Sequence, residues 1–473
     1  MFRIAYLKKA LFFRRYIAFL ISICYIFFMK DVRVSIHLTE EEHKAFKKLT
    51  KEKYHTSINK FLSDYIRLNL QREDAETLVQ SKLVSNPHYM VKAISLFANI
   101  GIAEAYFKEI GINVVAANEL IKKRADLYSK IYPETKMICG DILQDSIFDE
   151  IMDIGKKEKV DIILATPPCQ GMSTVGKQDK ADIRNTLILP VLDAIDVLMP
   201  KYIFIENVPM ILQTKIVYQE QEKLIIDVIK DRVETKYNIS VNRIDVKNYS
   251  VPQSRERAII LLSRKDVPVW EIPEKDQKVL TMRDAIGDLP PIDPFVKDVS
   301  EKELLKMFPH YYEREKAALA ISPWNFPPKH IKRQVEIMIH TPSGKSAFEN
   351  EKYYPVKDDG TPVKGFKNTY KRQDWDIPAY TVTMDNRKIS SQNNVHPGRY
   401  LGIDTNGDVL YSDPRALTIY ELMKIMSIPE DWPLPSDTEP AFLRSIIGEG
   451  IPSLFTKKVF LNNPLLKKKG KQQ

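Results

Sequence analysis

The sequence predicts an α/β protein that combines a doubly wound, mostly parallel sheet with a smaller second domain and a short N-terminal unit. Its 473 residues correspond to two to four domains, at roughly 100 to 200 residues each. From residue 91 onward, short apolar runs alternate with helical patterns, which is typical of parallel sheets with helical connections. This alternation stops between residues 270 and 375, a stretch rich in Pro, Lys, Tyr and Trp. We therefore expect that stretch to be an inserted or second domain.

The composition excludes two broad classes of protein. Hydrophobic residues make up 44% of the chain and charged residues 28%, which rules out a polytopic membrane protein and a wholly disordered chain. A net charge of +9 is compatible with a polyanionic partner. Three cysteines cannot form a disulfide framework, and the eight histidines show no CxxC or HxxxH spacing. The sequence thus predicts a reducing compartment and no metal site.

The first 28 residues form a separate leader. Five basic residues precede an uncharged apolar run at positions 16–28, which is shorter than the roughly 17 to 25 residues that a membrane-spanning helix needs. The run resembles the apolar part of a signal peptide, but no small-x-small cleavage pattern follows it. Two further interpretations stay open: a peripheral membrane anchor, or translation that starts at Met29, so that the leader is not part of the mature protein.

Residues 29–72 read as one strand followed by two helices. Apolar side chains alternate with Arg33, Ser35 and His37 along the strand, and Thr39 with Glu42 forms a capping box for the first helix. The unit resembles ribbon-helix-helix DNA-binding modules. That resemblance implies a homodimer in which Arg33, Ser35 and His37 face the bases. The alternative is an appendage used only for dimerisation. Polar residues 73–90 are expected to link it to the sheet domain.

The sheet domain is expected to span residues 91–269, and its strands are read from six apolar runs. These are residues 93–97, 114–117, 136–138, 160–165, 202–205 and 258–263. Ligands of doubly wound sheets lie beyond the carboxyl ends of the strands. The residues that follow each run are therefore the candidates for a functional site.

The segment after the fourth run carries the strongest chemical signal. It reads ATPPCQGMS at positions 165–173. Two prolines restrict the backbone immediately before Cys169, and Gly171 permits a tight turn from strand to helix. This setting displays the Cys169 thiol at the ligand-binding edge of the sheet. For Cys139 we expect instead a small buried hydrophobic side chain.

A set of ordered motifs resembles the cytosine-C5 DNA methyltransferase family, which uses S-adenosylmethionine. The resemblance runs from Ser95 to about Pro452. It implies the Rossmann-like fold of S-adenosylmethionine methyltransferases. It also implies a target recognition domain at 270–375 and later motifs at 376–465 that complete the catalytic domain. The matching segments are SLFANIGIAEAYF (95–107), Glu119, GDI (140–142), PPCQ (167–170), ENV (206–208), VPQSRER (251–257), RALTIYE (415–421) and IGEGIP (447–452).

The resemblance implies four catalytic residues. Cys169 would add to carbon 6 of cytosine and so make carbon 5 nucleophilic. Protonation of ring nitrogen 3 needs a carboxylic acid that can hold a proton, and Glu206 matches that role. Arg255 and Arg257 would hold the base and Glu206 in place. Because the target atom is unreachable in a stacked duplex, the base must be flipped out.

The resemblance also implies a cofactor site. Phe97 would pack on the adenine, Glu119 would bind the ribose hydroxyls, and Asp141 with the Ile142 backbone would bind the adenine edge. The glycine-rich first loop of the family, Phe-x-Gly-x-Gly-Gly, is Phe-Ala-Asn-Ile-Gly-Ile here, and Glu449 stands where the family usually has Asn. The residues expected to bind the cofactor are Phe97, Ala98, Asn99, Gly101, Glu119, Asp141, Ile142 and Pro168.

The expected function is methylation of cytosine in double-stranded DNA, as the modification enzyme that protects sites from a cognate restriction endonuclease. The expected location is the cytoplasm, in association with the nucleoid. Two alternatives remain at this point. An RNA cytosine-5 methyltransferase branch shares these motifs, and a DNA-binding regulator could carry a non-catalytic methyltransferase domain.

Overall fold

The computed structural model describes residues 91–168 and 183–467. The chain divides into two compact units, Met1–Lys82 and Leu83–Gln473, and all described residues belong to the second. The leader, the ribbon-helix-helix-like unit with Arg33, Ser35 and His37, and the linker lie outside the described residues. Cys169 lies outside them as well.

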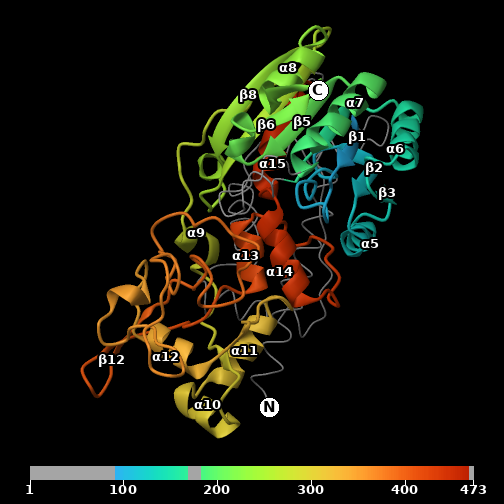
Figure 1. Ribbon diagram of the computed structural model, residues 1–473. Helices are drawn as coiled ribbons and strands as arrows, with labels where there is room; N and C mark the ends of the chain where they lie inside the picture. Colours follow the sequence, from blue (N-terminus) through green and yellow to red (C-terminus); the bar gives the residue numbers. More distant parts are fainter. Residues whose placement is uncertain (1–90, 169–182, 468–473) are drawn as a thin grey trace, which may run out of the picture. The chain divides into compact units, whose positions relative to one another are not determined.

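A seven-stranded sheet organises the part of the second unit that is drawn uppermost in Figure 1. Its strand order is β3-β2-β1-β4-β5-β9-β8. Strands β1 to β5 pair in parallel, whereas β9 runs antiparallel to both β5 and β8. The strands are β1 (Val91–Leu96), β2 (Ile112–Glu119), β3 (Lys136–Cys139), β4 (Ile162–Ala165), β5 (Tyr202–Asn207), β8 (Tyr237–Asp245) and β9 (Glu256–Arg264).

The six apolar runs of the sequence are confirmed as strands β1, β2, β3, β4, β5 and β9. Every residue of β4 and β5 is buried, as expected for central strands that are covered on both faces. The sequence did not predict β8, whose residues are mostly exposed or half-buried. The sheet is mostly parallel, as predicted, with β9 as the reversed strand.

Helices cover one face of the sheet through a large apolar cluster. This cluster joins Ile94, Ile163 and Ile205 of the strands to Val191 and Ile229 of the helices. Figure 1 shows the three helices concerned beside the strands. They are α6 (Asp145–Glu158), α7 (Ile188–Leu198) and α8 (Ile225–Val233).

A helix near the carboxyl end of the chain covers the opposite face. This helix, α15 (Ser453–Leu461), packs Phe455, Val459 and Phe460 into a second cluster with Phe204 of β5 and Trp270. The Phe460 ring lies 5.3 Å from that of Phe204 and 5.0 Å from that of Trp270. Residues at both ends of the described chain thus share one core. The other helices that flank the sheet are α5 (Lys122–Ile131) and α16 (Pro464–Lys467).

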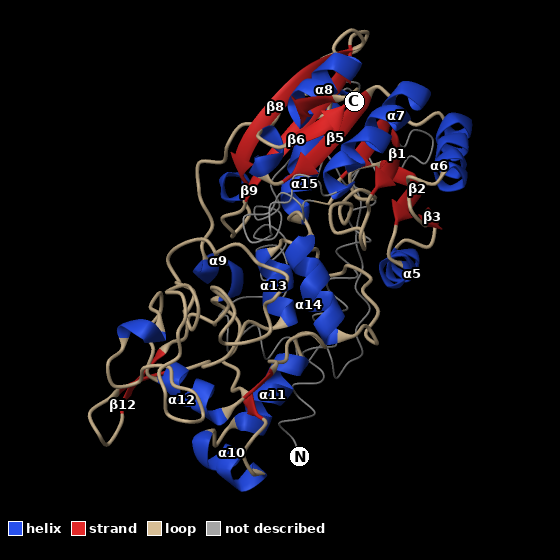
Figure 2. Cartoon of the chain, in the orientation of Figure 1, coloured by secondary structure: helices blue, strands red, loops and turns tan. Residues whose placement is uncertain are grey.

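Residues after 270 supply most of two further apolar clusters, and the first of these also includes Ile100 and Ile102 of the loop after β1. One centres on α9 (Met282–Ile286), α13 (Ile419–Ile425) and α14 (Pro440–Glu449), and a capping box of Thr418 and Glu421 begins α13. The other collects residues between Val296 and Val395, where loops predominate (Figure 2). The remaining elements are α10 (Glu301–Met307), α11 (Tyr311–Leu319), α12 (Lys332–Ile339), the strands β6 (Lys215–Tyr218), β7 (Gln221–Leu224), β10 (Phe295–Val296), β11 (Lys329–His330), β12 (Tyr400–Ile403) and β13 (Val409–Tyr411), and short 3₁₀ helices at Ile183–Leu187, Pro209–Leu212, Val246–Tyr249 and Ala347–Glu349.

Within residues 91–168 and 183–467, no helix combines the length and the apolar character that a bilayer crossing requires.

Candidate active site

Those predicted catalytic and cofactor-binding residues that the structure describes lie at or near one edge of the sheet. Strands β1, β2, β4 and β5 end there, and β9 begins there because it runs in the opposite direction. The strand order reverses between β1 and β4, and ligands of such sheets bind at this reversal.

Glu206 and Arg257 form a close ion pair at this edge. Glu206 lies near the end of β5 and Arg257 near the start of β9, and their carboxylate and Nε atoms are 2.6 Å apart. Their side chains are only 12% and 10% exposed, so water screens the pair weakly. The predicted juxtaposition of these two residues is present, and it fixes the direction in which the Glu206 carboxyl points.

The segment that leads to Cys169 is anchored on both sides. The Thr166 hydroxyl donates to the carbonyl of Phe97 over 3.0 Å. On the other side, the Asn207 amide donates to the carbonyl of Pro167 over 3.0 Å, and its oxygen accepts from the backbone of Val208. Asn207 therefore positions the loop before Cys169, although Cys169 itself lies outside the described residues.

Arg255 makes different contacts from Arg257. Its guanidinium donates to the carbonyls of Val382 and Gly448, each over 2.8 Å. Gln253 accepts a hydrogen bond from the backbone of Val382 over 3.1 Å. These contacts join the loop before β9 to the segment at Val382 and to the end of α14, so the described contacts of Arg255 are structural ties.

The first loop after β1 has an unusual backbone. Phe97, Asn99 and Gly101 have φ angles of 59°, 52° and 80°, in the left-handed region that Gly and Asn tolerate best. A Cβ atom at Gly101 would lie 2.2 Å from the Tyr132 ring, and the Tyr132 hydroxyl donates to the Gly101 carbonyl over 2.6 Å. The loop thus needs glycine at this position, while Asn99 serves where the family usually has glycine.

Two carboxylates lie at the ends of β2 and β3: Glu119 is the last residue of β2, and Asp141 follows β3. Glu119 is 6% exposed and accepts hydrogen bonds from the backbone of Asn99 over 3.0 Å and of Ile121 over 2.8 Å. Asp141 accepts from the backbone of Leu143 over 3.0 Å, and Ile142 is buried. Glu119 therefore braces the first loop directly, and Asp141 shapes the turn after β3.

Several features fit a bound S-adenosylmethionine. Leu120 and Leu143 directly follow these carboxylate segments and are 63% and 48% exposed, so they offer apolar contact for a purine ring beside hydrogen-bonding groups. The Asn99 side-chain oxygen is buried and has no hydrogen-bond partner among the described residues. Neither leucine was predicted as a site residue, because sequence alone does not separate an exposed leucine from a buried one.

A buried ionic cluster supports the region around α13. Arg415 is fully buried between Asp413 and Glu421, with contacts of 2.9 and 2.8 Å. His396 lies 3.8 Å from Asp413 and 3.7 Å from Glu421. Burial lowers the pKa of His396 to about 4, so this imidazole is neutral at physiological pH. The buried carboxylates are therefore balanced by Arg415 rather than by His396.

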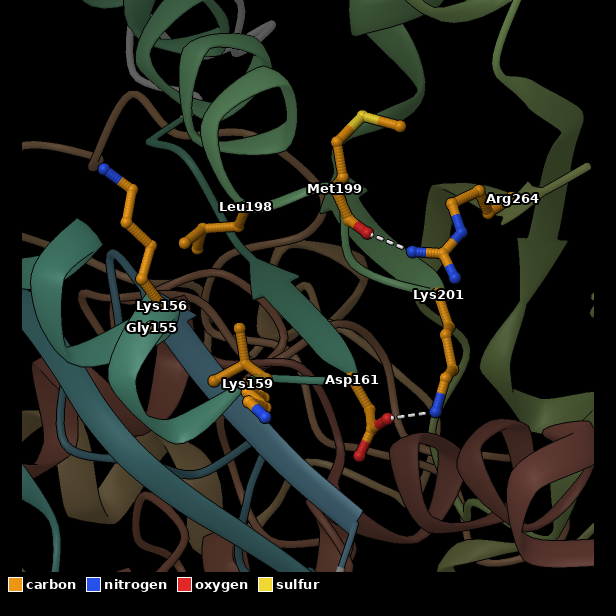
Figure 3. Close-up of a pocket in the computed structure, with 9 residues that line it drawn as sticks. Gly155, Lys156, Lys159, Asp161, Leu198, Met199, Lys201 and Arg264 are labelled. Carbon is orange, nitrogen blue, oxygen red and sulfur yellow. Dashed lines mark hydrogen bonds and ion pairs between the residues drawn. The ribbon is translucent and has the colours of Figure 1, made fainter. Parts of the chain in front are cut away.

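A separate pocket lies at the opposite edge of the sheet (Figure 3). Its volume is about 390 Å³, and its walls come from residues that precede β4 and β5. Two of its polar groups already have partners, because Lys201 pairs with Asp161 and Arg264 donates to the carbonyl of Met199. The pocket is remote from the carboxyl ends of the parallel strands. Its lining residues are Gly155, Lys156, Lys159, Val160, Asp161, Leu198, Met199, Lys201 and Arg264.

One sequence expectation about cysteine is wrong. Cys139 is exposed, because it ends the edge strand β3 rather than entering the core. Among the described residues, no three His, Cys, Asp or Glu side chains are grouped so that they could hold a metal ion.

Comparisons with known proteins show which family this chain resembles. Residues 91–462 match the family model of C-5 cytosine-specific DNA methylases. The type II methyltransferase M1.HgaI of Avibacterium volantium is 41% identical over 382 residues, which cover 79% of this chain and 99% of that protein. The type II methyltransferase M.XorII of Xanthomonas oryzae is 27% identical and covers 77% of this chain and 82% of its own.

Among solved structures, a prophage-encoded DNA modification methyltransferase of E. coli has the same fold. It superimposes with a TM-score of 0.54 at 18% identity and covers 79% of this chain and 98% of its own.

Proposed function

The chain belongs to the C-5 cytosine-specific DNA methylase family, and from this membership we propose that it is the modification enzyme of a restriction-modification system. Its relatives M1.HgaI and M.XorII are named type II methyltransferases, and the match to M1.HgaI extends over nearly all of that protein. The cognate partner is then a restriction endonuclease that cuts the same DNA sequence.

The reaction of the family is transfer of a methyl group to carbon 5 of cytosine in DNA. S-adenosylmethionine supplies that methyl group when it is bound. The residues of this chain must make carbon 5 nucleophilic, hold the flipped base, and keep water away from the reacting atoms.

Cys169 is the proposed nucleophile, and the support comes from its neighbours. The Pro167 and Thr166 contacts hold the preceding loop between the ends of β1 and β5. Anchors two and three residues before the thiol support its role, because a fixed attachment point lowers the entropic cost of bringing a nucleophile to carbon 6 of the base. The addition forms a carbon–sulfur bond at carbon 6 and makes carbon 5 an enamine carbon. After methylation, loss of the carbon 5 proton and the thiolate restores the aromatic ring.

Glu206 is the proposed acid at ring nitrogen 3, and the Glu206–Arg257 pair is the observation that carries this role. Arg257 holds one carboxylate oxygen at 2.6 Å, and the other oxygen can then face the base. Arg255 donates to two backbone carbonyls, so we propose that it holds the segments around the base in place.

The cofactor would lie over the first loop, at the edge where β1 and β2 end. Glu119 suits the ribose hydroxyls, Asp141 and Ile142 suit the adenine edge, and Phe97 suits the adenine face. Ala98, Asn99, Gly101 and Pro168 complete the residues proposed to surround it. Glu119 and Ile142 are buried side chains next to exposed apolar ones, which supports a ligand with both polar and apolar parts.

The proposal extends to the parts that read the DNA. Residues 270–375 would recognise the target sequence, and double-stranded DNA of the nucleoid in the cytoplasm would be the substrate. From the sequence, the ribbon-helix-helix-like unit would add DNA contacts through Arg33, Ser35 and His37 and pair two copies of the chain.

One experiment tests the function whatever the target sequence is. The full chain is expressed in a host that lacks cytosine methylation, and its DNA and RNA are read by bisulfite sequencing. We expect 5-methylcytosine in one DNA sequence context, and none when the chain carries Cys169→Ser. Methylation confined to RNA, or methylation that survives Cys169→Ser, would contradict the proposal.

A further inference from the structure

An ion pair joins two helices next to the first loop. Arg124 on α5 and Glu449 at the end of α14 meet in a two-pronged contact, with both nitrogen–oxygen distances at 2.8 Å. Each side chain is 18% exposed. The two residues are separated by 325 positions in the chain. Their contact therefore joins an early and a late segment of the described chain beside the proposed cofactor site.

Glu449 also reaches the loop itself. Its second oxygen accepts a hydrogen bond from the Asn99 side chain over 3.4 Å, while the backbone of Asn99 donates to Glu119. Asn99 is therefore held from both sides in a left-handed conformation, with φ at 52°. The conformation costs more for Asn than for Gly, and these two contacts offset that cost.

The following residues show the same close fit between the first loop and the segment after α14. A Cβ atom at Gly450 would lie 3.1 Å from Ile102, and the Ser453 hydroxyl donates to the carbonyl of Ile102 over 2.8 Å. Ile102 stands where the family usually has glycine, and the absence of a side chain at Gly450 leaves room for it. The first loop thus differs from the usual family sequence at Asn99 and Ile102, and each of these residues contacts the segment 449–453: Asn99 through Glu449, and Ile102 through Gly450 and Ser453.

The electrostatics make Arg124 necessary to this arrangement. Glu449 is the last residue of α14, where the helix dipole disfavours a carboxylate. Burial and the nearby Glu119 raise the pKa of Glu449, whereas Arg124 opposes that shift. Without the guanidinium, the carboxylates of Glu449 and Glu119 would lie beside one loop, and Glu449 would have lost the cation that pairs with it.

We propose that Arg124 and Glu449 are positioning residues that hold Asn99, and with it the first loop, in the shape that binds the cofactor. The pair sets the affinity for the cofactor without touching the reacting atoms. This inference rests on the proposed placement of S-adenosylmethionine over the first loop, and it is independent of the restriction-modification assignment.

The test measures cofactor binding to the full chain by calorimetry, with S-adenosylmethionine and its product S-adenosylhomocysteine as probes. For Glu449→Gln we expect the Kd of both compounds to rise about tenfold, because the loop loses its preformed shape. At saturating cofactor, kcat should stay within about twofold of the wild-type value. A Kd within about twofold of wild type for both probes would overturn the proposal.

A double-mutant cycle separates this role from general stability. In a chain that carries Asn99→Gly, the loop no longer depends on the side-chain contact, so adding Glu449→Gln should raise the Kd by less than about twofold. Equal, independent effects in both backgrounds would mean that the residues act through folding alone.

Lys123 provides the matched control. It neighbours Arg124 and also contacts α14, through Glu439 and the Phe442 ring, but it is 56% exposed. Lys123→Gln should leave both Kd values unchanged, and a tenfold rise would show that any loosening of the helix contact weakens binding, contrary to the proposal. A wild-type chain that binds the cofactor but methylates no DNA would refute the proposed function and leave this inference intact.

Discussion

At the scale of single residues, the buried Glu206–Arg257 ion pair can be compared with an exposed ion pair that involves Glu256, the residue before Arg257. Glu256 lies between Arg255 and Arg257 in sequence but points to the opposite side of β9, where it pairs with Arg243 in the open. The two glutamate–arginine pairs are of similar length, 2.6 and 2.7 Å, yet the first is about 10% exposed and the second more than half exposed. Water screens an exposed ion pair and leaves its side chains free to move, so such a pair contributes little. Of the two pairs, the buried Glu206–Arg257 pair is therefore the one that can orient a reacting group.

This contrast gives a prediction with an internal control. Glu206→Gln should lower kcat by a factor of about 10² to 10⁴, the usual contribution of a general acid, because an amide cannot donate and then regain the proton. Methylation of a cognate duplex with radiolabelled cofactor measures the rate. Glu256→Gln should change it less than about twofold, and equal losses in the two variants would refute the assignment.

A second buried carboxyl has no part in the proposed chemistry. Glu104 is almost fully buried below the first loop, where the Tyr128 hydroxyl donates to it. Burial raises its pKa from 4.5 to about 7. The folded chain therefore keeps a proton on Glu104 at pH values at which the unfolded chain has lost it.

The sign of the resulting pH dependence follows from proton linkage. Between pH 4.5 and about 7 the folded state binds more protons at Glu104, so this residue costs stability progressively as the pH rises, up to about 3 kcal/mol. We expect Glu104→Gln to raise the Tm at pH 8 but to have little effect at pH 5. Thermal unfolding at both pH values measures this, and an equal change at both would contradict it.

At the scale of elements, three separate segments of the chain contact the carboxyl end of α14. Arg255 from the loop before β9, Arg124 from α5 and Asn99 from the first loop all contact residues 448 and 449. The carbonyl of Thr383 approaches so closely that a Cβ atom at Gly448 would lie 2.2 Å away. The position therefore admits only glycine, although its backbone conformation is ordinary.

Gly448→Ala tests this packing. The added methyl group would meet a backbone carbonyl, which cannot move aside as a side chain can, so we expect a loss of about 1 to 3 kcal/mol of stability and weaker methyl transfer. Thermal unfolding and methylation assays measure the two effects. Ser445→Ala, on the same helix and half-buried, should change neither. A stable and fully active Gly448→Ala would show that the contact is not tight.

The elements also show how far sequence reasoning reaches. All six apolar runs became strands because a run of three to six mostly apolar residues is too short for a helix and buries its side chains best within a sheet. Strand β8 was not predicted because it has no continuous apolar run. It pairs with only one neighbour at the edge of the sheet, and polar residues alternate with apolar ones over a partly exposed face. The direction of β9 is set by tertiary pairing, which leaves no local signal.

The same limit applies to the site. The order of the motifs placed Glu206 and Arg257 together, since both flank adjacent strand ends. It could not place Arg255, whose partners Val382 and Gly448 lie 127 and 193 residues away. The Arg124–Glu449 pair could not be predicted from the sequence either, because many residues of opposite charge lie far apart in any chain and nothing local indicates which of them pair.

At the scale of the whole molecule, the boundary between the two compact units falls at residues 82 and 83, and the family match begins at residue 91. Removing residues 1–82 should therefore leave methylation of a cognate oligonucleotide intact, while DNA affinity falls or the oligomeric state changes if the ribbon-helix-helix-like unit acts as proposed. Filter binding and light scattering measure the two effects. A soluble truncated chain without methylation activity would contradict the independence of the second unit.

The position of α15 has a consequence for biosynthesis. Phe455, Val459 and Phe460 complete the second face of the central sheet, and Trp270 donates to the carbonyl of Val459 over 3.0 Å. Until α15 has been translated, the part of that face that these side chains cover stays exposed. The polypeptide can thus reach its native state only after α15 has been translated, and a stop codon before α15 should yield an aggregating fragment rather than a weakened enzyme.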